Sequence, residues 1–221
     1  MLKPRIALVI TDQETNAQIK RLGVDLLELR ADLFKKLDPA YVVAQIKLRR
    51  QLKIPLLLTV RNQKKEGAVK ECSDALKWWV IEAALPFVDF LDIEFSSPLL
   101  KQAVALSRKL KKQVIVSSHN FDHTPAHLNP MLKKALSTGA NIVKIAAKAN
   151  SWEDVLRMVE FTNHYRKYRL ITMSLGPLGA ISRIVLPAAG SLYTYTFLKK
   201  PTAPGQIDVA TLRTHLKLYY P

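Results

Sequence analysis

The residue best suited to covalent chemistry is Lys144, because it interrupts the apolar run "NIVKIAA" at residues 141–147. Lysine is seldom fully buried, so an amine in such a run needs an ion-pair partner or a chemical role. A desolvated lysine beside other cations has a lowered pKa, and the neutral amine can attack a ketone or an aldehyde to form a Schiff base. A lysine paired with Glu94, or one that snorkels to the surface, explains the same pattern equally well.

Other charged side chains also interrupt apolar runs, mostly near the carboxyl end of each run. They are Glu28, Arg30 and Asp32, then Arg61, Asp92, Glu94 and, one run before Lys144, His119. An ion pair would be the best explanation for a single one of them. It is a poor explanation for the whole set, because each buried charge costs several kcal/mol unless it is paired. Since His119 can move protons near a lysine adduct, the set favours a catalytic site.

The three histidines His119, His123 and His127 do not form a recognisable metal motif. A helix predicted to begin at Thr124-Pro125 would separate them, and the pattern H-E-x-x-H is absent. We therefore expect no metal site.

Eight short apolar runs alternate with helix-like segments along the chain. Most runs are too continuously apolar for simple alternation, which is typical of parallel strands covered by helices. The runs span residues 5–11, 24–29, 55–60, 88–95, 113–118, 141–147, 169–174 and 191–197. Helices are predicted to begin at Asp38-Pro39, Ser97-Pro98 and Thr124-Pro125, at Ser151 with a capping box to Asp154, and over residues 209–220.

This order of elements predicts a (β/α)8 TIM barrel that occupies residues 1–221 as a single domain. A doubly wound open sheet is the alternative, but no G-x-G-x-x-G motif follows the first run. In a TIM barrel the catalytic groups lie at the carboxyl ends of the strands, which is where the charged set falls.

The composition indicates a cytoplasmic protein, and its charge raises the question of an anionic partner. The net charge is +16, but the basic doublets are spread along the chain, which favours a solvated basic surface. The single cysteine, Cys72, excludes an internal disulfide. No apolar stretch is long enough to cross a bilayer or to form the h-region of a signal peptide. We expect no membrane association and no nucleic-acid partner.

Seven segments together resemble the type I 3-dehydroquinate dehydratase family. They are "ELRADLF" (28–34), "LLLTVR" (56–61), "FLDIEF" (90–95), "VIVSSHNFDHTP" (114–125), "NIVKIA" (141–146), "ITMSLGPLGAISR" (171–183) and "TAPGQI" (202–207). Any one of them is weakly specific, whereas the ordered set is highly specific. The resemblance implies a (β/α)8 barrel, commonly a homodimer without metal or cofactor, that converts 3-dehydroquinate to 3-dehydroshikimate in the shikimate pathway.

The resemblance also implies roles for individual residues. Lys144 would form a Schiff base with the C3 ketone, and His119 would remove a C2 proton and help to expel the C1 hydroxyl as water. Glu28, Arg30 and Arg61 would orient the ring hydroxyls and neighbouring charges. Arg183 would bind the carboxylate, Thr202 and Gln206 would close over the substrate on a lid, and Glu66 would lie beside His119, with Met173 expected in the pocket wall.

This sequence departs from the family pattern at a few positions. Glu66 falls one residue later than the family places its glutamate, after Lys65. Thr202 replaces a serine and keeps the hydroxyl, Leu175 replaces a methionine, and Asn120 stands where an aspartate is common. The N-terminal hairpin that often closes the barrel base in this family is expected to be absent, since the chain begins almost at the first run.

Two other functions remain open on the sequence. One is another lysine-dependent barrel enzyme such as an aldolase, which would not need the carboxylate clamp at Arg183 or the "TAPGQ" lid. The other is a basic nucleic-acid-binding protein or a catalytically silent barrel with a binding role. The charge suggests this second function, but no stacking-aromatic motif or recognition helix supports it.

Overall fold

Parallel β-strands alternate with α-helices in the computed structural model, which describes residues 3–220. The strands are β1 (Ile6–Ile10), β2 (Leu26–Arg30), β3 (Leu56–Thr59), β4 (Phe90–Glu94), β5 (Gln113–Asn120), β6 (Ile142–Lys148), β7 (Leu170–Leu175), β8 (Thr194–Phe197) and the short β9 (Ile207–Asp208). The first eight each overlap one of the predicted runs, because parallel strands buried on both faces need nearly continuous apolar sequence.

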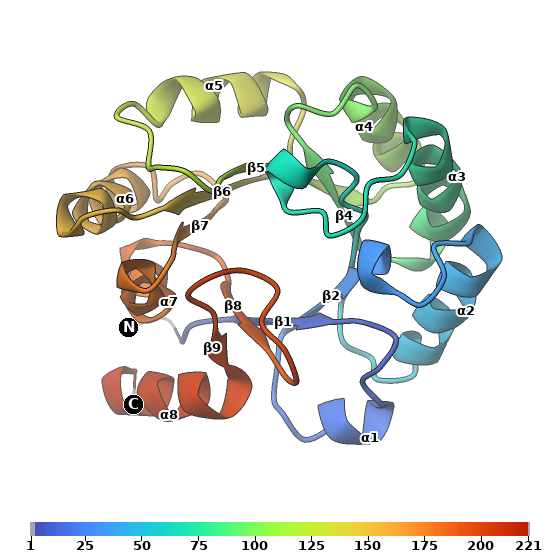
Figure 1. Cartoon of the computed structure of the whole chain (residues 1–221), viewed down its shortest axis with the longest axis horizontal. Helices are drawn as coiled ribbons and strands as arrows, with labels where there is room; N and C mark the ends of the chain where they lie inside the picture. The colour runs from blue at the N-terminus through green and yellow to red at the C-terminus, as the bar shows by residue number, and fades with distance from the viewer. Residues whose placement is uncertain (1–2, 221) are drawn as a thin grey trace.

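Helices connect successive strands along the outside of the sheet (Figure 1). The α-helices are α1 (Asn16–Ile19), α2 (Pro39–Arg50), α3 (Asp74–Ala84), α4 (Leu100–Lys109), α5 (Asn129–Ser137), α6 (Trp152–His164), α7 (Ser182–Ala189) and α8 (Val209–Tyr219). Short 3₁₀ helices are η1 (Ala31–Leu33), η2 (Lys64–Glu66), η3 (Leu85–Phe87) and η4 (Leu178–Ile181). Within residues 3–220, no helix is both long enough and apolar enough to span a membrane.

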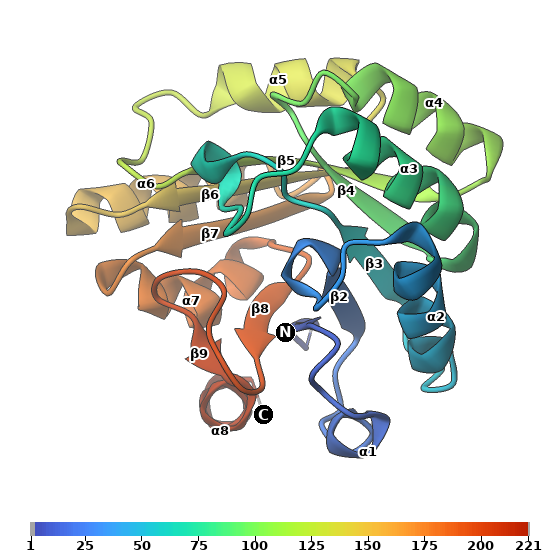
Figure 2. The ribbon, with the colours of Figure 1, turned by 45° about the vertical axis from the view of Figure 1, so that its right-hand side comes forward.

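The strands form one curled sheet in the order β7-β6-β5-β4-β3-β2-β1-β8-β9 (Figures 1 and 2). No strand ladder joins β7 to β8 in the described part of the chain. Hydrogen bonds that cross this seam run from Leu192 N to Leu170 O at 2.8 Å, from Thr172 N to Ser191 Oγ at 3.1 Å and from Ser191 Oγ to Thr172 O at 3.5 Å. Helix α7 ends at Ala189 with Gly190 as its left-handed C-cap, and β8 begins only at Thr194, so the first residues of the last predicted run lie before the strand. The predicted (β/α)8 barrel is confirmed, with this open seam between its two ends.

The strands place apolar and polar side chains at different depths of the barrel interior. Leu26 and Ile142 belong to the inner core cluster, near the amino ends of β2 and β6. Residues two positions apart on a strand face the same side. Glu28 and Lys144 therefore also point into the interior, but closer to the carboxyl ends of the strands. The inner core closes the barrel below them, so the polar groups are held at the mouth.

Two predicted helix starts are confirmed by their caps. Asp38 Oδ1 accepts a hydrogen bond from Tyr41 N at 2.9 Å, and Pro39 occupies the first turn of α2. Helix α8 begins at Val209, where Asp208 Oδ1 accepts from two backbone N–H groups at 3.0 Å. These local signals were readable because a cap depends only on residues within one turn.

The helix predicted to begin at Thr124-Pro125 is wrong, since α5 begins at Asn129. Thr124 Oγ1 donates instead to Lys148 O at 2.8 Å, which ties the loop after β5 to the end of β6. The hydroxyl is thus used in a tertiary contact rather than as a cap. The argument that a helix separates the histidines therefore fails. The described residues contain no cluster of three or more His, Cys, Asp or Glu side chains that could hold a metal ion.

Two further starts differ in detail. Ser97 Oγ accepts from Leu99 N at 3.3 Å, and α4 begins only at Leu100. Helix α6 follows Ser151 as predicted. The Ser151 side chain makes no capping hydrogen bond, and Asp154 Oδ2 accepts from Asn150 N at 2.9 Å instead. The carboxylate still satisfies a free N–H at the helix entrance, one residue earlier than the predicted box.

Candidate active site

Lys144 points into the barrel interior from β6, and its side chain is only 4% exposed. Its Nζ lies 3.2 Å from Asp92 Oδ2, 3.4 Å from Glu28 Oε1 and 4.2 Å from the centroid of the Tyr195 ring. It neither snorkels to the surface nor pairs with Glu94, so both structural explanations offered by the sequence are wrong. Its nearest charged partners are carboxylates rather than the cations that the sequence suggested.

Hydroxyl groups on neighbouring strands fix these two carboxylates. Thr59 Oγ1 donates to Glu28 Oε1 at 2.6 Å, and Ser117 Oγ donates to Asp92 Oδ1 at 2.6 Å. The parallel register places Ser117 beside Lys144 and Thr59 beside Asp92. The carboxylates are therefore held in place by bonds that do not depend on the amine.

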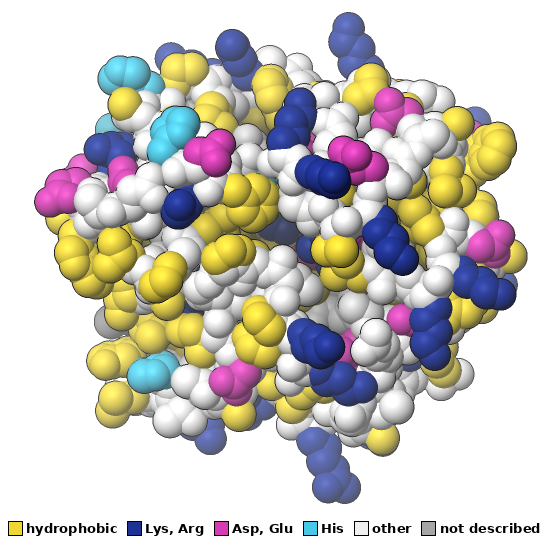
Figure 3. Space-filling model, viewed as in Figure 1, with side chains coloured by type: hydrophobic (Ala, Val, Ile, Leu, Met, Phe, Trp, Pro, Cys, Tyr) yellow, Lys and Arg dark blue, Asp and Glu magenta, His cyan; other side chains and the backbone are white. Residues whose placement is uncertain are grey.

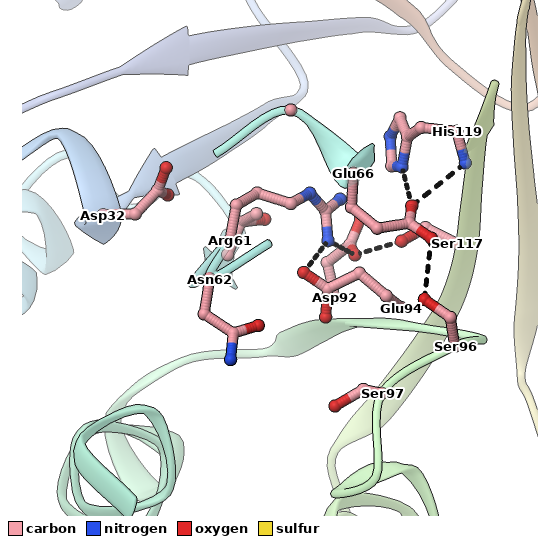
Figure 4. A network of polar contacts seen from close by, with 12 residues as sticks. Asp32, Arg61, Asn62, Glu66, Asp92, Glu94, Ser96, Ser97, Ser117 and His119 are labelled. Carbon is pink, nitrogen blue, oxygen red and sulfur yellow. Dashed lines mark hydrogen bonds and ion pairs between the residues drawn. The ribbon is translucent and has the colours of Figure 1, made fainter. Parts of the chain in front are cut away.

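Arg61 adds a second buried cation next to Lys144. Its Nη1 lies 2.8 Å from Asp92 Oδ1 and 3.1 Å from Glu94 Oε1, and Figure 4 shows the guanidinium between these two carboxylates. Burial alone would raise the pKa of Asp92, but the positive charges of Arg61 and Lys144 outweigh burial and hold that pKa well below its usual value. Asp92 is therefore ionised at neutral pH.

His119, at the carboxyl end of β5, is held by Glu66 from the loop after β3. Glu66 Oε2 lies 3.0 Å from the ring Nδ1 and accepts from the backbone N of His119 at 3.1 Å, while Glu66 Oε1 accepts from Ser96 Oγ at 2.8 Å (Figure 4). The extra residue before Glu66 is thus absorbed by the loop, which forms η2. Burial and the charge of Arg61 lower the pKa of His119, and the hydrogen bond to Glu66 only partly offsets them.

Arg183 is a buried cation without an anionic partner. Its Nη1 contacts Met173 Sδ at 3.1 Å, while Nε and Nη2 have no hydrogen-bond partner among the described residues. Burial lowers the pKa of Arg183 to about 10. The Tyr195 hydroxyl is likewise buried and unpartnered. Such groups are rare in folded proteins and indicate a place where a ligand supplies the missing acceptor.

The loop after β8 carries Thr202 and Gln206. Gln206 Oε1 accepts from Thr202 N at 2.6 Å and from Ala203 N at 3.2 Å, which folds the loop on itself. Gly205 has φ +75°, and a Cβ there would meet Gly176 O at 2.2 Å. The glycine therefore lets this loop dock closely against the loop after β7.

Arg30 is already engaged within the protein. Its Nε and Nη2 donate to Asp32 at 2.9 and 2.7 Å, and Nη2 also donates to Gly67 O at 3.1 Å. This bidentate pair fixes the guanidinium plane and ties the loop after β3 to the end of β2. Arg30 offers its remaining donors to the pocket from a rigid position.

One pocket collects nine of the ten predicted site residues, which are Glu28, Arg30, Arg61, Glu66, His119, Lys144, Met173, Thr202 and Gln206. Arg183 lines a small adjoining cavity, which shares Met173 and Tyr195 with the main pocket. Figure 3 shows a narrow opening near the centre of this face, with Lys and Arg side chains scattered around it. Sequence reasoning missed Tyr195, although the alternation in "LYTYTF" predicts that Tyr193 and Tyr195 face the same side, and both belong to the inner core cluster.

The fold and the site together define a TIM-barrel protein with a buried lysine in a pocket at the carboxyl ends of its strands. A model of the type I 3-dehydroquinase family matches residues 6–221, and the chain belongs to this family. A 3-dehydroquinate dehydratase from Hydrogenobaculum sp. is 34% identical over 220 residues, which cover 98% of this chain and 99% of that protein. The one from Thermodesulfovibrio yellowstonii is 35% identical over 213 residues, covering 93% and 91%.

Solved structures agree with the sequence relatives. The 3-dehydroquinate dehydratase from Aquifex aeolicus superposes with a TM-score of 0.87 at 32% identity, covering 98% of this chain and 99% of that chain. The one from Geobacillus kaustophilus gives a TM-score of 0.87 at 31% identity, covering 97% and 90%. These proteins are hydro-lyases, and a Schiff-base mechanism is characteristic of the type I family. The resemblance found in the sequence is therefore confirmed at the level of family and fold.

Proposed function

We propose that this chain dehydrates 3-dehydroquinate to 3-dehydroshikimate through a Schiff base on Lys144. The observation that carries the proposal is the position of Lys144, whose buried amine lines a pocket at the carboxyl ends of the barrel strands in a member of this family. Residues 1–221 act as one catalytic domain, because the groups that line this pocket come from β1 through the loop after β8.

The covalent steps are those of amine chemistry. Lys144 Nζ adds to the C3 ketone, and loss of water leaves a protonated imine. The imine draws electrons from C2, so the C2–H bond breaks and its electrons form an enamine. The enamine then expels the C1 hydroxyl, which leaves as water once protonated and gives a conjugated product. Hydrolysis of the imine by water releases 3-dehydroshikimate and restores the amine.

His119 acts as the acid and base in these steps. Its lowered pKa keeps the imidazole neutral near pH 7, so one ring nitrogen is free to accept the C2 proton. The Glu66 carboxylate at Nδ1 favours the tautomer in which Nδ1–H donates and Nε2 accepts. The same Nε2 returns the proton to the leaving hydroxyl.

The remaining residues bind and enclose the substrate. Arg183 pairs with the substrate carboxylate, a role that its buried and unpartnered state supports, because the guanidinium offers a planar fork of donors. Glu28, Arg30 and Arg61 orient the ring hydroxyls and neighbouring charges. Thr202 and Gln206 close the pocket from the loop after β8, and Met173 forms its wall. This carboxylate clamp favours the dehydratase over an aldolase.

The test is to mix the protein with 3-dehydroquinate, follow the ultraviolet absorbance of the conjugated product, and trap the imine with borohydride. Mass spectrometry is expected to show the adduct on Lys144. Lys144→Ala should lose the adduct and about 10,000-fold or more in kcat, the scale seen when a nucleophile is removed. Lys148→Ala is the matched control, since this exposed lysine ends the same strand. If the parent protein gives neither product nor adduct, the proposed function is wrong.

The chain is also proposed to act as a cytoplasmic homodimer without a nucleic-acid partner. Trp152 and Leu156, one turn apart on α6, are 57% and 58% exposed and offer an apolar contact for a second copy. On the face that Figure 3 shows, the Lys and Arg side chains are scattered, which argues against a nucleic-acid footprint on that face. Light scattering at two salt concentrations, with and without duplex DNA, tests both statements.

A further inference from the structure

Lys77, on α3, is a fully buried lysine that the proposed chemistry does not use. Its side chain is 0% exposed, and it does not line the substrate pocket. Its Nζ donates to Glu94 Oε2 and, at 3.1 Å, to Asn62 Oδ1. Asn62 Nδ2 in turn donates to Asp74 at the start of α3, at 2.7 Å. Burying an ammonium group is costly, so its position needs a reason beyond packing.

Lys77 begins a continuous chain of buried ion pairs that runs from α3 to Lys144, and this chain gives the buried ammonium group a role. Lys77 contacts Glu94, Glu94 contacts Arg61, Arg61 contacts Asp92, and Asp92 contacts Lys144. Lys144 also contacts Glu28, so three cations alternate with three carboxylates. The charges balance only when Lys77 is included.

Glu94 is the link through which Lys77 reaches the site. Burial alone would raise the pKa of Glu94, but the charges of Arg61 and Lys77 outweigh it and the pKa lies below its usual value. Each oxygen of the carboxylate has its own cation, with Lys77 on Oε2 and Arg61 on Oε1. Figure 4 shows Arg61 in contact with both Glu94 and Asp92. If Glu94 attracted the guanidinium more strongly, Arg61 would move away from Asp92.

We propose that Lys77 is a positioning residue for the dehydration. By holding one oxygen of Glu94, it leaves Arg61 shared between Glu94 and Asp92, and so keeps Asp92 fixed beside Lys144. It also supplies the positive charge that balances the buried carboxylates. This inference rests on the proposed function and adds a residue outside the pocket to the groups that set its chemistry.

Loss of the Lys77 charge would leave the site one unit more negative. Lys144 and His119 line the same pocket. Extra negative charge there favours the protonated form of His119, which cannot accept the C2 proton. The charged and titratable groups around these two residues are Glu28 on β2, Arg61 after β3, Glu66 on η2, Asp92 and Glu94 on β4, and Tyr195 on β8. The acidic limb of the kcat/KM profile should therefore move to higher pH when Lys77 loses its charge.

The experiment is a double-mutant cycle with Lys77→Met, Glu94→Gln and the double variant, each assayed with 3-dehydroquinate across pH. Lys77→Met is expected to lower kcat by about 10- to 100-fold, the range for a small misplacement of catalytic groups, with KM nearly unchanged. Its acidic limb should move to higher pH, and that of Glu94→Gln to lower pH. The double variant should regain most of kcat, because both buried charges are then gone. Lys101→Met, on the exposed side of α4, is the control and should match the parent.

Several outcomes would overturn the inference. One is a folded Lys77→Met protein with the parent's kcat and pH profile. Another is a loss of activity that follows a lowered Tm and is not rescued in the double variant, because a purely structural role predicts that pattern. If Lys77→Met does not fold, Lys77→Arg carries the test, since a retained charge should keep the parent's acidic limb. An inactive parent protein would instead refute the proposed function, so the two failures are distinguishable.

Discussion

His119 Nδ1 lies 3.0 Å from Glu66 Oε2, and the same carboxylate oxygen accepts the backbone N–H of His119. This double contact fixes both the ring and the strand end that carries it. It forms although Glu66 falls one residue later in its loop than the family pattern predicts. The 3₁₀ turn η2, which ends at Glu66 and is capped by Gly67 with φ +90°, lies in the loop that carries the additional residue.

Replacing Glu66 with Gln tests this relationship. The amide keeps the shape of the side chain but loses its charge, and the hydrogen bond that His119 makes to Glu66 raises the pKa of His119. We expect the pKa of His119 to fall further, so the acidic limb of the kcat/KM profile should move to lower pH. The rate should fall by about 10-fold, which is less than the range of about 100- to 10,000-fold for loss of the general acid–base catalyst itself.

His119→Gln provides the comparison for that variant. It should lower kcat by about 100- to 10,000-fold, while borohydride still traps an adduct on Lys144, because imine formation precedes proton abstraction. A Glu66→Gln protein with an unchanged pH profile would show that the carboxylate does not act on the imidazole.

Arg183 is expected to strengthen substrate binding and to lower the free energy of unfolding of the protein. Since Nε and Nη2 are buried with no hydrogen-bond partner within residues 3–220, Arg183→Met should raise the free energy of unfolding by about 1–3 kcal/mol. The same change should lower kcat/KM by about 100-fold or more, because the substrate carboxylate loses its partner. Urea unfolding and steady-state kinetics measure the two effects.

Arg157→Met is the matched control for Arg183. Arg157 lies on α6, is 37% exposed, and pairs with Asp154 at 2.6 Å. Loss of this surface pair should change stability by about 0.5 kcal/mol or less and leave kcat/KM unaltered. If Arg183→Met destabilised the protein more than this control does, the guanidinium would have to be satisfied in the free enzyme.

Acid should destabilise the protein through Asp92 and Glu94. The pKa of each carboxyl is lowered in the folded state, so the unfolded state binds more protons over the intervening pH range. Their contribution is complete above the unfolded value of about 4 and is lost as the pH falls below it. The free energy of unfolding should therefore decline steeply below about pH 4. Chemical denaturation of the parent and Asp92→Asn proteins between about pH 3 and pH 7 should show a shallower decline in the variant.

The amino-acid sequence by itself determined the barrel and most members of the site. Continuous apolar runs indicate buried parallel strands, and the carboxyl ends of parallel strands meet at one edge of the sheet. The positions of Lys144, His119 and Glu28 along the chain were therefore enough to place them in one region. Their chemistry follows from residue type. The cap at Asp38 was equally readable, because capping is decided within one helical turn.

Only the tertiary structure decided which side chains touch. Lys144 meets Glu28 across 116 positions of sequence, and its predicted alternative partner Glu94 is taken by Lys77 and Arg61. Thr124 donates to a carbonyl on the next strand instead of capping a helix as predicted. Such choices depend on strand register and curvature, which bring several possible partners within reach of each charge. The local sequence pattern does not say which of these partners each charge contacts. The geometry of the folded barrel determines it.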